Sequence, residues 1–216
     1  MKLKRVLILI FATSFLTIGI YRFKLSRVLL TDSTTVAIQP FEFTDTEIMD
    51  SIAFHLTNNY GFRVIILPSV DLPQKAFVQV KSPRYRADIL LKHLQEIIPD
   101  SVDYILGLTS KDISTTKRDD LGRIKKPESK YKDWGIFGLG YRPGNACVVS
   151  SFRLTSNRTK TINRLIKVCN HEIGHNLGLK HCTEGKNCVM DDANETIKTV
   201  DNGSSTLCDA CYSKIH

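Results

Sequence analysis

Hydrophobic residues follow two different spacings in the first part of the chain. Residues 34–41 (TTVAIQPF) and 62–70 (FRVIILPSV) are short apolar runs rich in β-branched side chains, which favours strands. Between them, residues 45–61 have apolar positions at helical spacing, and this segment ends at Gly61. We therefore expect a strand, a helix and a second strand, with the two strands buried and paired in parallel.

Further along the chain, the pattern predicts a second helix, a third strand and a hairpin. Residues 84–98 (RYRADILLKHLQEII), which follow Pro83, have helical spacing, and residues 102–109 (VDYILGLT) are another apolar run. Residues 134–141 (WGIFGLGY) and 146–154 (ACVVSSFRL) flank the turn sequence RPGN, which predicts a hairpin. The outer strand of this hairpin is a candidate edge along which a peptide binds.

A long helix is expected from about residue 157 to residue 177, followed by an irregular C-terminal part. This order of strands and helices predicts an α/β (α+β) fold with a mixed sheet. The length of residues 31–216 fits one domain, and we expect it to be a monomer.

The first 30 residues differ in composition from the rest of the chain. MKLKR is followed by an apolar run at residues 6–21 and then by a second basic stretch, YRFKLSR. This order is typical of a secretory signal or a membrane anchor, so we expect residues 1–30 to export the protein or to anchor it to a membrane. Basic residues flank the apolar run on both sides and leave its orientation undecided.

The net charge of +8 is concentrated in the same N-terminal segment. Six of the 30 Lys and Arg residues precede residue 30, where no acidic residue occurs, so residues 31–216 hold 24 basic and 22 acidic side chains. This balance does not favour nucleic acid as a partner. The local exception is residues 117–132 (KRDDLGRIKKPESKYK), for which we expect a solvated loop, with a partner or membrane contact as the alternative.

One segment, HEIGHNLGLKHC, combines three histidines and a glutamate at a spacing suited to a metal ion. On a helix, His171 and His175 lie one turn apart on the same face, whereas Glu172 is turned away from them. Gly178 stands where the helix must end for the chain to double back, which makes His181 a third ligand. We predict that the three histidines bind a catalytic zinc ion and that Glu172 is the catalytic general base for a water molecule.

A site of this kind is hydrolytic, and hydrolysis of peptide bonds in a peptide or protein substrate is the leading interpretation. Two alternatives use the same ligands. One is a zinc hydrolase that acts on a non-peptide substrate, and the other is a catalytically silent zinc-binding protein. The three histidines as ordinary helix side chains are the remaining alternative, but the added Gly178 and His181 disfavour it.

Four further cysteines form two close pairs, spaced Cx5C and CxxC: Cys182, Cys188, Cys208 and Cys211. Four thiolates in this arrangement predict a second, closed and structural zinc site. Two disulfides or a redox-active CxxC are the alternatives, because the N-terminal segment indicates export.

Two cysteines are left over, Cys147 and Cys169, and both lie in apolar surroundings. We expect them to be buried thiols, with a disulfide between them as the alternative in an oxidising compartment.

The whole C-terminal motif resembles a known family. HExxHxxGxxH followed by a methionine is the metzincin pattern, and HExxHxxGxxHC followed by CxM and CxxC is similar to the archaemetzincins in particular. Cys188, Val189 and Met190 supply the CxM, and 17 residues separate Met190 from Cys208. The resemblance, which rests on residues 171–211, implies a metzincin-like zincin domain with two zinc ions, peptidase activity that is aminopeptidase-like in some members, and Met190 packed beneath the catalytic site.

Overall fold

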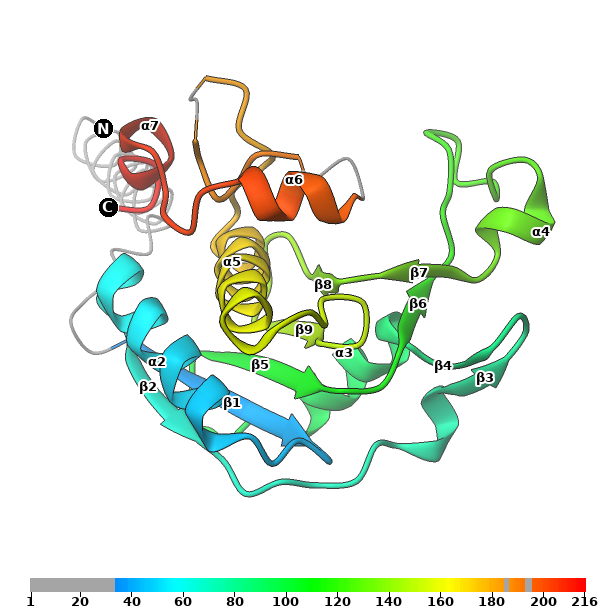
Figure 1. Cartoon of the computed structure of the whole chain (residues 1–216), viewed down its shortest axis with the longest axis horizontal. Coiled ribbons are helices and arrows are strands. Elements are labelled where there is room, and N and C mark those ends of the chain that lie inside the picture. The colour runs from blue at the N-terminus through cyan, green and yellow to red at the C-terminus, as the bar shows by residue number, and fades with distance from the viewer. Residues whose placement is uncertain (1–33, 185–186, 193–195) are drawn as a thin grey trace, which may run out of the picture.

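The computed structural model describes residues 34–184, 187–192 and 196–216, and it contains two sheets and their covering helices (Figure 1). The larger sheet and the helices on it are β1 (Thr35–Phe41), α2 (Thr46–Tyr60), β2 (Arg63–Ile66), α3 (Ala87–Ile97), β5 (Tyr104–Thr109), β8 (Gly138–Gly140), β9 (Ala146–Ser150) and α5 (Arg158–Asn176). The remaining elements are the 3-10 helix η1 (Gln74–Ala76), β3 (Phe77–Gln79), β4 (Pro83–Arg86), β6 (Ile113–Thr115), α4 (Glu128–Tyr131), β7 (Trp134–Ile136), α6 (Ile197–Asn202) and α7 (Asp209–Tyr212). The predicted α/β fold with a mixed sheet is confirmed.

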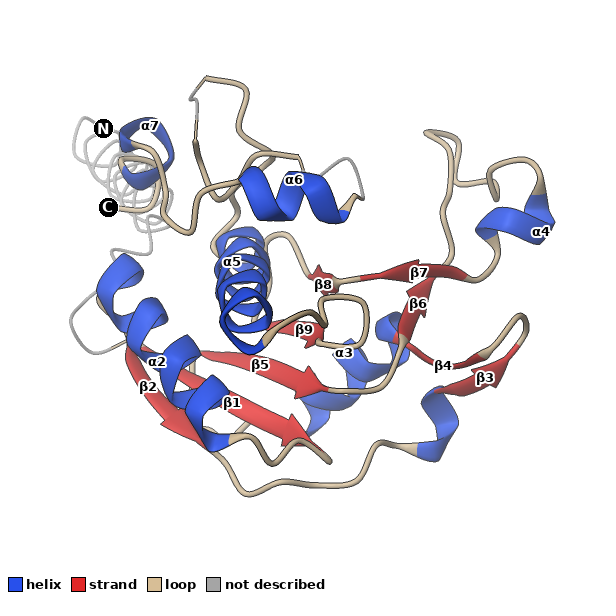
Figure 2. Ribbon diagram, viewed as in Figure 1, coloured by secondary structure: helices blue, strands red, loops and turns tan. Residues whose placement is uncertain are grey.

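The larger sheet has the strand order β2-β1-β5-β9-β8. Four strands run in parallel, and β8 pairs antiparallel with β9, which makes β8 an outer strand. Helices α2 and α5 pack on one face and α3 packs on the other (Figure 2). Side chains of β1 alternate accordingly, because Val36 and Ile38 join the core under α2 and α5, whereas Ala37 joins the core under α3.

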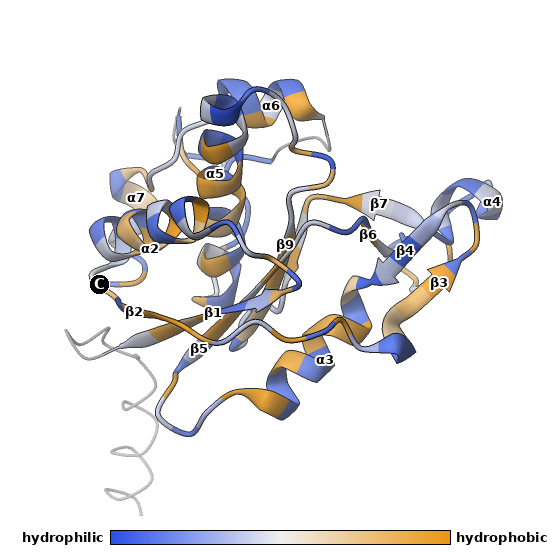
Figure 3. Cartoon of the chain, turned by 60° about the horizontal axis from the view of Figure 1, so that its bottom comes forward, coloured by the Kyte–Doolittle hydropathy of each residue, from blue (hydrophilic) through white to orange (hydrophobic). Residues whose placement is uncertain are grey.

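The smaller sheet, in the order β3-β4-β6-β7, extends from one side of the larger sheet. Figure 3 shows hydrophobic residues along β5 and β9 in the centre of the molecule, whereas α4 beyond the smaller sheet is hydrophilic. A buried ionic network joins the two sheets. Asp112 accepts hydrogen bonds from Arg84 at 2.8 Å and from Arg153 at 2.7 Å, and Arg84 also reaches Asp133 at 3.0 Å. The smaller sheet is therefore held firmly beside the larger one.

Several elements differ from the sequence prediction. Strand β2 does pair in parallel with β1, but it ends at Ile66 and is not buried, because it is the outer strand at the β2 end of the sheet. Residues 83–86 form β4, so α3 begins only at Ala87. The predicted hairpin is limited to β8 and β9, because β7 leaves the larger sheet and pairs with β6.

Residues 117–132 are largely exposed, as expected of a solvated segment, but they are not without structure. They contain α4, and Arg118 forms a β-bridge with Ile124. The segment is thus a folded extension of the smaller sheet.

The predicted signal or membrane anchor falls at residues 1–30, outside the described residues. Across the part of the chain that the structure does describe, no helix has the length and apolar character required to cross a membrane. An apolar run at residues 6–21 is also shorter than the about 20 residues that a bilayer span needs. The described structure therefore gives no support to the predicted signal segment, membrane anchor or export, and these predictions are withdrawn.

Candidate active site and metal centre

Helix α5 carries the first two histidines, and both of its ends are defined by side-chain or backbone chemistry. At its start, Oδ1 of Asn157 accepts a hydrogen bond from the N–H of Lys160 at 3.0 Å, which caps the helix. Just beyond its end, Gly178 has a φ of 91°, a left-handed conformation that favours glycine. The chain then turns back toward the helix, as the sequence predicts.

This turn brings the three predicted histidine ligands together. The ring centroids of His171 and His175 are 4.6 Å apart, and that of His181 lies 5.3 and 5.1 Å from them. One ring nitrogen from each residue lies within 4.8 Å of the other two. Three imidazoles that converge on one point in this way fit a single metal ion.

Main-chain carbonyls orient the two helical imidazoles. The Nδ1 atom of His171 lies 2.7 Å from the carbonyl oxygen of Val189, and Nδ1 of His175 lies 2.8 Å from that of Leu179. Because a carbonyl oxygen only accepts, both Nδ1 atoms carry the proton, and the lone pair of each Nε2 is free for a metal. His171 and His175 therefore have the tautomer, as well as the spacing, that zinc binding through Nε2 requires.

The charge states of the histidines also suit metal binding. Burial lowers the pKa of His171, and burial together with the nearby His171 lowers the pKa of His175 to about 4. Both rings are thus neutral near pH 7, the form that coordinates a metal. His181 is more exposed, and its Nδ1 lies 3.7 Å from a carboxylate oxygen of Asp192.

Glu172 is buried, with 7% of its surface exposed, and it faces strand β8 rather than the histidines' side of α5. Its carboxylate accepts a hydrogen bond from the N–H of Gly140. Burial raises the pKa of Glu172 to about 8, and the bond from Gly140 opposes this rise. The predicted general base therefore lies between α5 and the outer strand of the sheet.

Two glycines of β8, whose role is not predicted from the sequence, make room for this carboxylate. A Cβ atom at Gly138 would lie 2.8 Å from both Cγ and Oε1 of Glu172, and one at Gly140 would lie 2.9 Å from the Glu172 carbonyl oxygen. Real Cβ atoms do not approach other atoms so closely. Glycines inside a strand often mark a close backbone approach, so the run FGLGY contained this signal.

Met190 is completely buried beneath α5. Its Sδ atom occupies the space next to Gly174, where an added Cβ would lie only 2.3 Å away. This places Met190 under the helix turn that joins His171 to His175. Its contribution is packing, as the sequence analysis expects.

The four C-terminal cysteines, Cys182, Cys188, Cys208 and Cys211, form a second cluster whose Sγ atoms lie within 4.8 Å of one another. The Sγ atoms of Cys182 and Cys208 are 3.7 Å apart. Tetrahedral zinc with Zn–S bonds of about 2.3 Å requires sulfur atoms about 3.8 Å apart, whereas a disulfide requires about 2.05 Å. All six cysteines of the chain lie among the described residues and none of them forms a disulfide, so the arrangement fits a zinc site and not disulfides.

The two clusters share a backbone. The N–H of Cys182 donates to the carbonyl oxygen of Met190 at 2.8 Å, directly after His181. Sγ of Cys188 accepts from the N–H groups of Met190 and Cys208, each at 3.4 Å, and such bonds favour a thiolate. A metal at the cysteines would therefore stabilise the loop that presents the third histidine.

Cys147 and Cys169 are fully buried free thiols, as the sequence analysis expects. Burial raises the pKa of both thiols above the ordinary value. They take no part in either cluster.

Comparison with known proteins decides the family. The sequence profile of Peptidase family M54 matches residues 31–216. The chain belongs to Peptidase family M54. An archaemetzincin of Archaeoglobus fulgidus is 30% identical over 181 residues, which cover 83% of this chain and 98% of the relative. An archaemetzincin of Halobacterium salinarum is 29% identical over 166 residues, with coverages of 72% and 84%.

Solved structures of M54 relatives have the same fold. The crystal structure of the Archaeoglobus fulgidus archaemetzincin, complexed with malonate, matches with a TM-score of 0.66 and 29% identity over 84% of this chain and all (100%) of that one. The Methanopyrus kandleri archaemetzincin matches with a TM-score of 0.70 and 26% identity, covering 87% of this chain and 96% of the other. The archaemetzincin resemblance is therefore confirmed, and family membership places this M54 chain among the zinc metallopeptidases.

Proposed function

We propose that this chain hydrolyses peptide bonds at the three-histidine centre with Glu172 as the general base. The observation that carries the proposal is the position of the Glu172 carboxylate, buried against the outer strand β8 while its helix neighbours His171 and His175 converge with His181. A peptide bound along β8 would therefore meet the carboxylate and the metal centre together.

The three histidines would hold the catalytic zinc ion. Zinc with three neutral ligands lowers the pKa of a bound water to about 7 and polarises a carbonyl oxygen. Glu172 accepts a proton from the attacking water and returns it to the leaving amine nitrogen. Gly138 and Gly140 leave room for the Glu172 carboxylate against β8.

Strand β8 is an outer strand of the larger sheet, and an extended substrate would pair with it at Gly138, because the N–H of Gly140 already donates to Glu172. Phe137 accepts a hydrogen bond from Ser150 at 2.9 Å, and Tyr141 donates to Ala146 at 3.2 Å, so these odd-numbered positions face β9. Because antiparallel strands alternate, the backbone of Gly138 faces away from β9. A substrate peptide can add to this edge as a further strand.

The four cysteines support a second zinc ion with a structural role. A zinc site made of four thiolates is closed and leaves no position for water, so we assign no catalysis to it. Its position directly after His181 suits a support for the catalytic loop.

The general-base role is tested with Glu172→Gln in the zinc-loaded full chain. The amide cannot accept the proton, so we expect cleavage of a peptide library to fall at least about 100-fold while the zinc content stays that of the parent. Glu96→Gln, the same substitution at an exposed position on α3, is the matched control and should keep the parent's activity. Equal cleavage by Glu172→Gln and the parent would show that this mechanism is wrong.

The other two function classes are outcomes of the same assay. A parent protein that cleaves no peptide but hydrolyses esters or other amides would be a non-peptide zinc hydrolase. One that binds zinc and turns over nothing would be a silent zinc-binding protein. Aminopeptidase-like action is the finer form of the proposal, and it predicts that acetylation of the substrate's amino end abolishes cleavage.

A further inference from the structure

A folded, basic segment of the chain lies just before strands β7 and β8, and β8 packs against Glu172. We call residues 117–134 the basic lobe. Its segments are joined by backbone hydrogen bonds, from the N–H of Lys117 to Tyr131 and from the N–H of Lys125 to Lys117, each 3.0 Å long. Figure 1 shows α4 and the loop before it projecting at one side of the molecule. The lobe therefore presents its side chains from a defined scaffold.

Positive charge on this lobe is only partly neutralised. Two of its ion pairs, Arg123–Asp119 at 2.9 Å and Lys126–Glu128 at 2.7 Å, are internal to the lobe. Lys125 and Lys130 are exposed, and neither forms an ion pair within the described residues. Two lysines remain available to an anion.

An aromatic pair lies beside Lys130 and Lys117. Tyr131 and Trp134 stack with ring centroids 5.4 Å apart. The Nζ atom of Lys130 lies 5.5 Å from the Trp134 ring, and that of Lys117 lies 4.9 Å from it. Cation–π contacts of this kind hold ammonium groups in place. Burial lowers the pKa of Lys117, the neighbouring Lys125 lowers it further, and the carboxylate of Asp192 opposes this change.

The lobe is connected to the active site by two short strands, β7 and β8, which are separated by Phe137. Trp134 opens β7, and β8 begins at Gly138 after a single intervening residue, so that β7 and β8 follow one another in Figure 1. Four residues of extended chain span about 13 Å. A peptide that lies along β8 with its cleaved bond beside Glu172 would therefore reach the lobe about four residues away.

We propose that Lys125, Lys130 and Trp134 form a subsite that binds an acidic side chain of the peptide substrate about four residues from the cleaved bond. This inference rests on the proposed function, because it assigns the site a substrate class. The two ammonium groups attract a carboxylate, and the Trp134 ring holds the ammonium group of Lys130 in position. A nucleic acid fits less well, because residues 31–216 as a whole hold 24 basic and 22 acidic side chains.

Trp134 is the only tryptophan of the chain, so its fluorescence reports on this subsite directly. The probes are two ten-residue amidated peptides, one with Glu and one with Lys at positions 4–6, titrated into zinc-loaded Glu172→Gln protein. We expect a saturable change of Trp134 fluorescence with the Glu peptide, at least about 10-fold weaker binding of the Lys peptide, and weaker binding of the Glu peptide at high salt.

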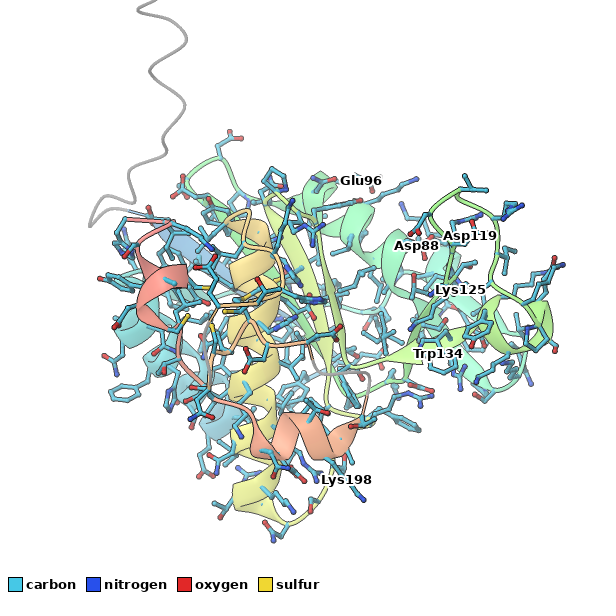
Figure 4. The ribbon with its side chains drawn as sticks, turned by 90° about the horizontal axis from the view of Figure 1, so that it is seen from above. Asp88, Glu96, Asp119, Lys125, Trp134 and Lys198 are labelled. Carbon is cyan, nitrogen blue, oxygen red and sulfur yellow. The ribbon has the colours of Figure 1, made fainter. Side chains whose placement is uncertain are left out.

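Lys125→Glu with Lys130→Glu should abolish this difference between the two peptides. Lys198→Glu is the matched control, because Lys198 is an exposed lysine on α6, apart from Lys125 and Trp134 in Figure 4. It should bind both peptides as the parent does. Parent protein with the catalytic Glu172 should likewise cleave the Glu peptide at least about 10-fold faster than the Lys peptide.

The outcomes separate this inference from the proposed function. Cleavage of both peptides at equal rates, with equal fluorescence changes, overturns the acidic subsite and leaves the peptidase standing. Selective binding of the Glu peptide without any cleavage supports the subsite and removes the proposed function. Tighter binding of a single-stranded oligonucleotide than of the Glu peptide, lost in the Lys125→Glu, Lys130→Glu protein, overturns the subsite in favour of nucleic acid.

Discussion

Single residues outside α5 decide whether its histidines can bind a metal. The carbonyl oxygens of Val189 and Leu179 hold the protons of His171 and His175 on Nδ1. Both carbonyls belong to the chain that follows the helix. The metal site is therefore specified by the turn after α5 as much as by the helix itself.

Gly138 offers a test of how closely β8 fits the carboxylate of Glu172, the proposed general base. In Gly138→Ala the new methyl group would overlap Glu172 Cγ and Oε1, each 2.8 Å away, so the carboxylate must move. We expect kcat to fall about 10- to 100-fold, the cost of misplacing a catalytic group by about 1 Å. Steady-state kinetics with a cleaved peptide, together with zinc analysis, measure this effect, and the zinc content should not change.

Leu139→Ala is the control on the same strand, because Leu139 packs against the core under α3, away from Glu172. Its kcat should stay close to that of the parent. A Gly138→Ala protein with the parent's kcat would show that Glu172 has more freedom than this packing allows.

The sequence predicts the three histidine ligands because they lie close together along the chain, within residues 171–181. Gly178 allows the chain to turn after the helix, and this turn brings His181 back to the other two histidines. The sequence does not reveal the role of Gly138, because that role depends on the approach of β8 to α5, two elements that meet only in the folded chain.

The segment after α5 contains His181 and the four cysteines, so it contributes to both candidate metal clusters. His181→Ala removes one ligand of an open site, so we expect one zinc to be lost while the fold and the second zinc remain. Cys208→Ser breaks a closed site whose binding energy is part of folding, so we expect the melting temperature to fall by more than about 5 °C. Activity should fall together with the melting temperature, because the backbone of Cys182, which directly follows His181, is hydrogen-bonded to Met190. Zinc analysis and thermal melts of both variants measure these effects.

Equal thermal stability of Cys208→Ser and the parent would contradict a structural role for the four cysteines. Ser204→Ala, an exchange in the same C-terminal segment outside both clusters, is the control for the melts and should lose no zinc.

Helices and strands are predicted correctly from the sequence where the hydrophobic pattern extends over many residues. Helix α5 begins at Arg158 and ends at Asn176, within the predicted segment, and β1 and β5 also lie within theirs. The prediction fails for the smaller sheet, whose strands β3, β4, β6 and β7 have only three or four residues each. Strands that short carry little periodicity, and their pairing depends on distant partners such as the ionic network around Asp112.

The larger sheet holds β8 beside α5. The smaller sheet places the basic lobe next to β7, which is followed in the chain by β8. The N-terminal residues add most of the net charge in the sequence, whereas the described part supplies both metal clusters and Glu172. The two candidate metal clusters therefore both lie in the C-terminal part of the described chain.

The most direct test of the account is the zinc content of the purified full chain, measured together with its free thiols after unfolding in a chelator. We expect two zinc ions per chain and all six thiols in reduced form. One zinc ion with four oxidised cysteines would contradict the second centre. A chain that binds no zinc would contradict the account as a whole.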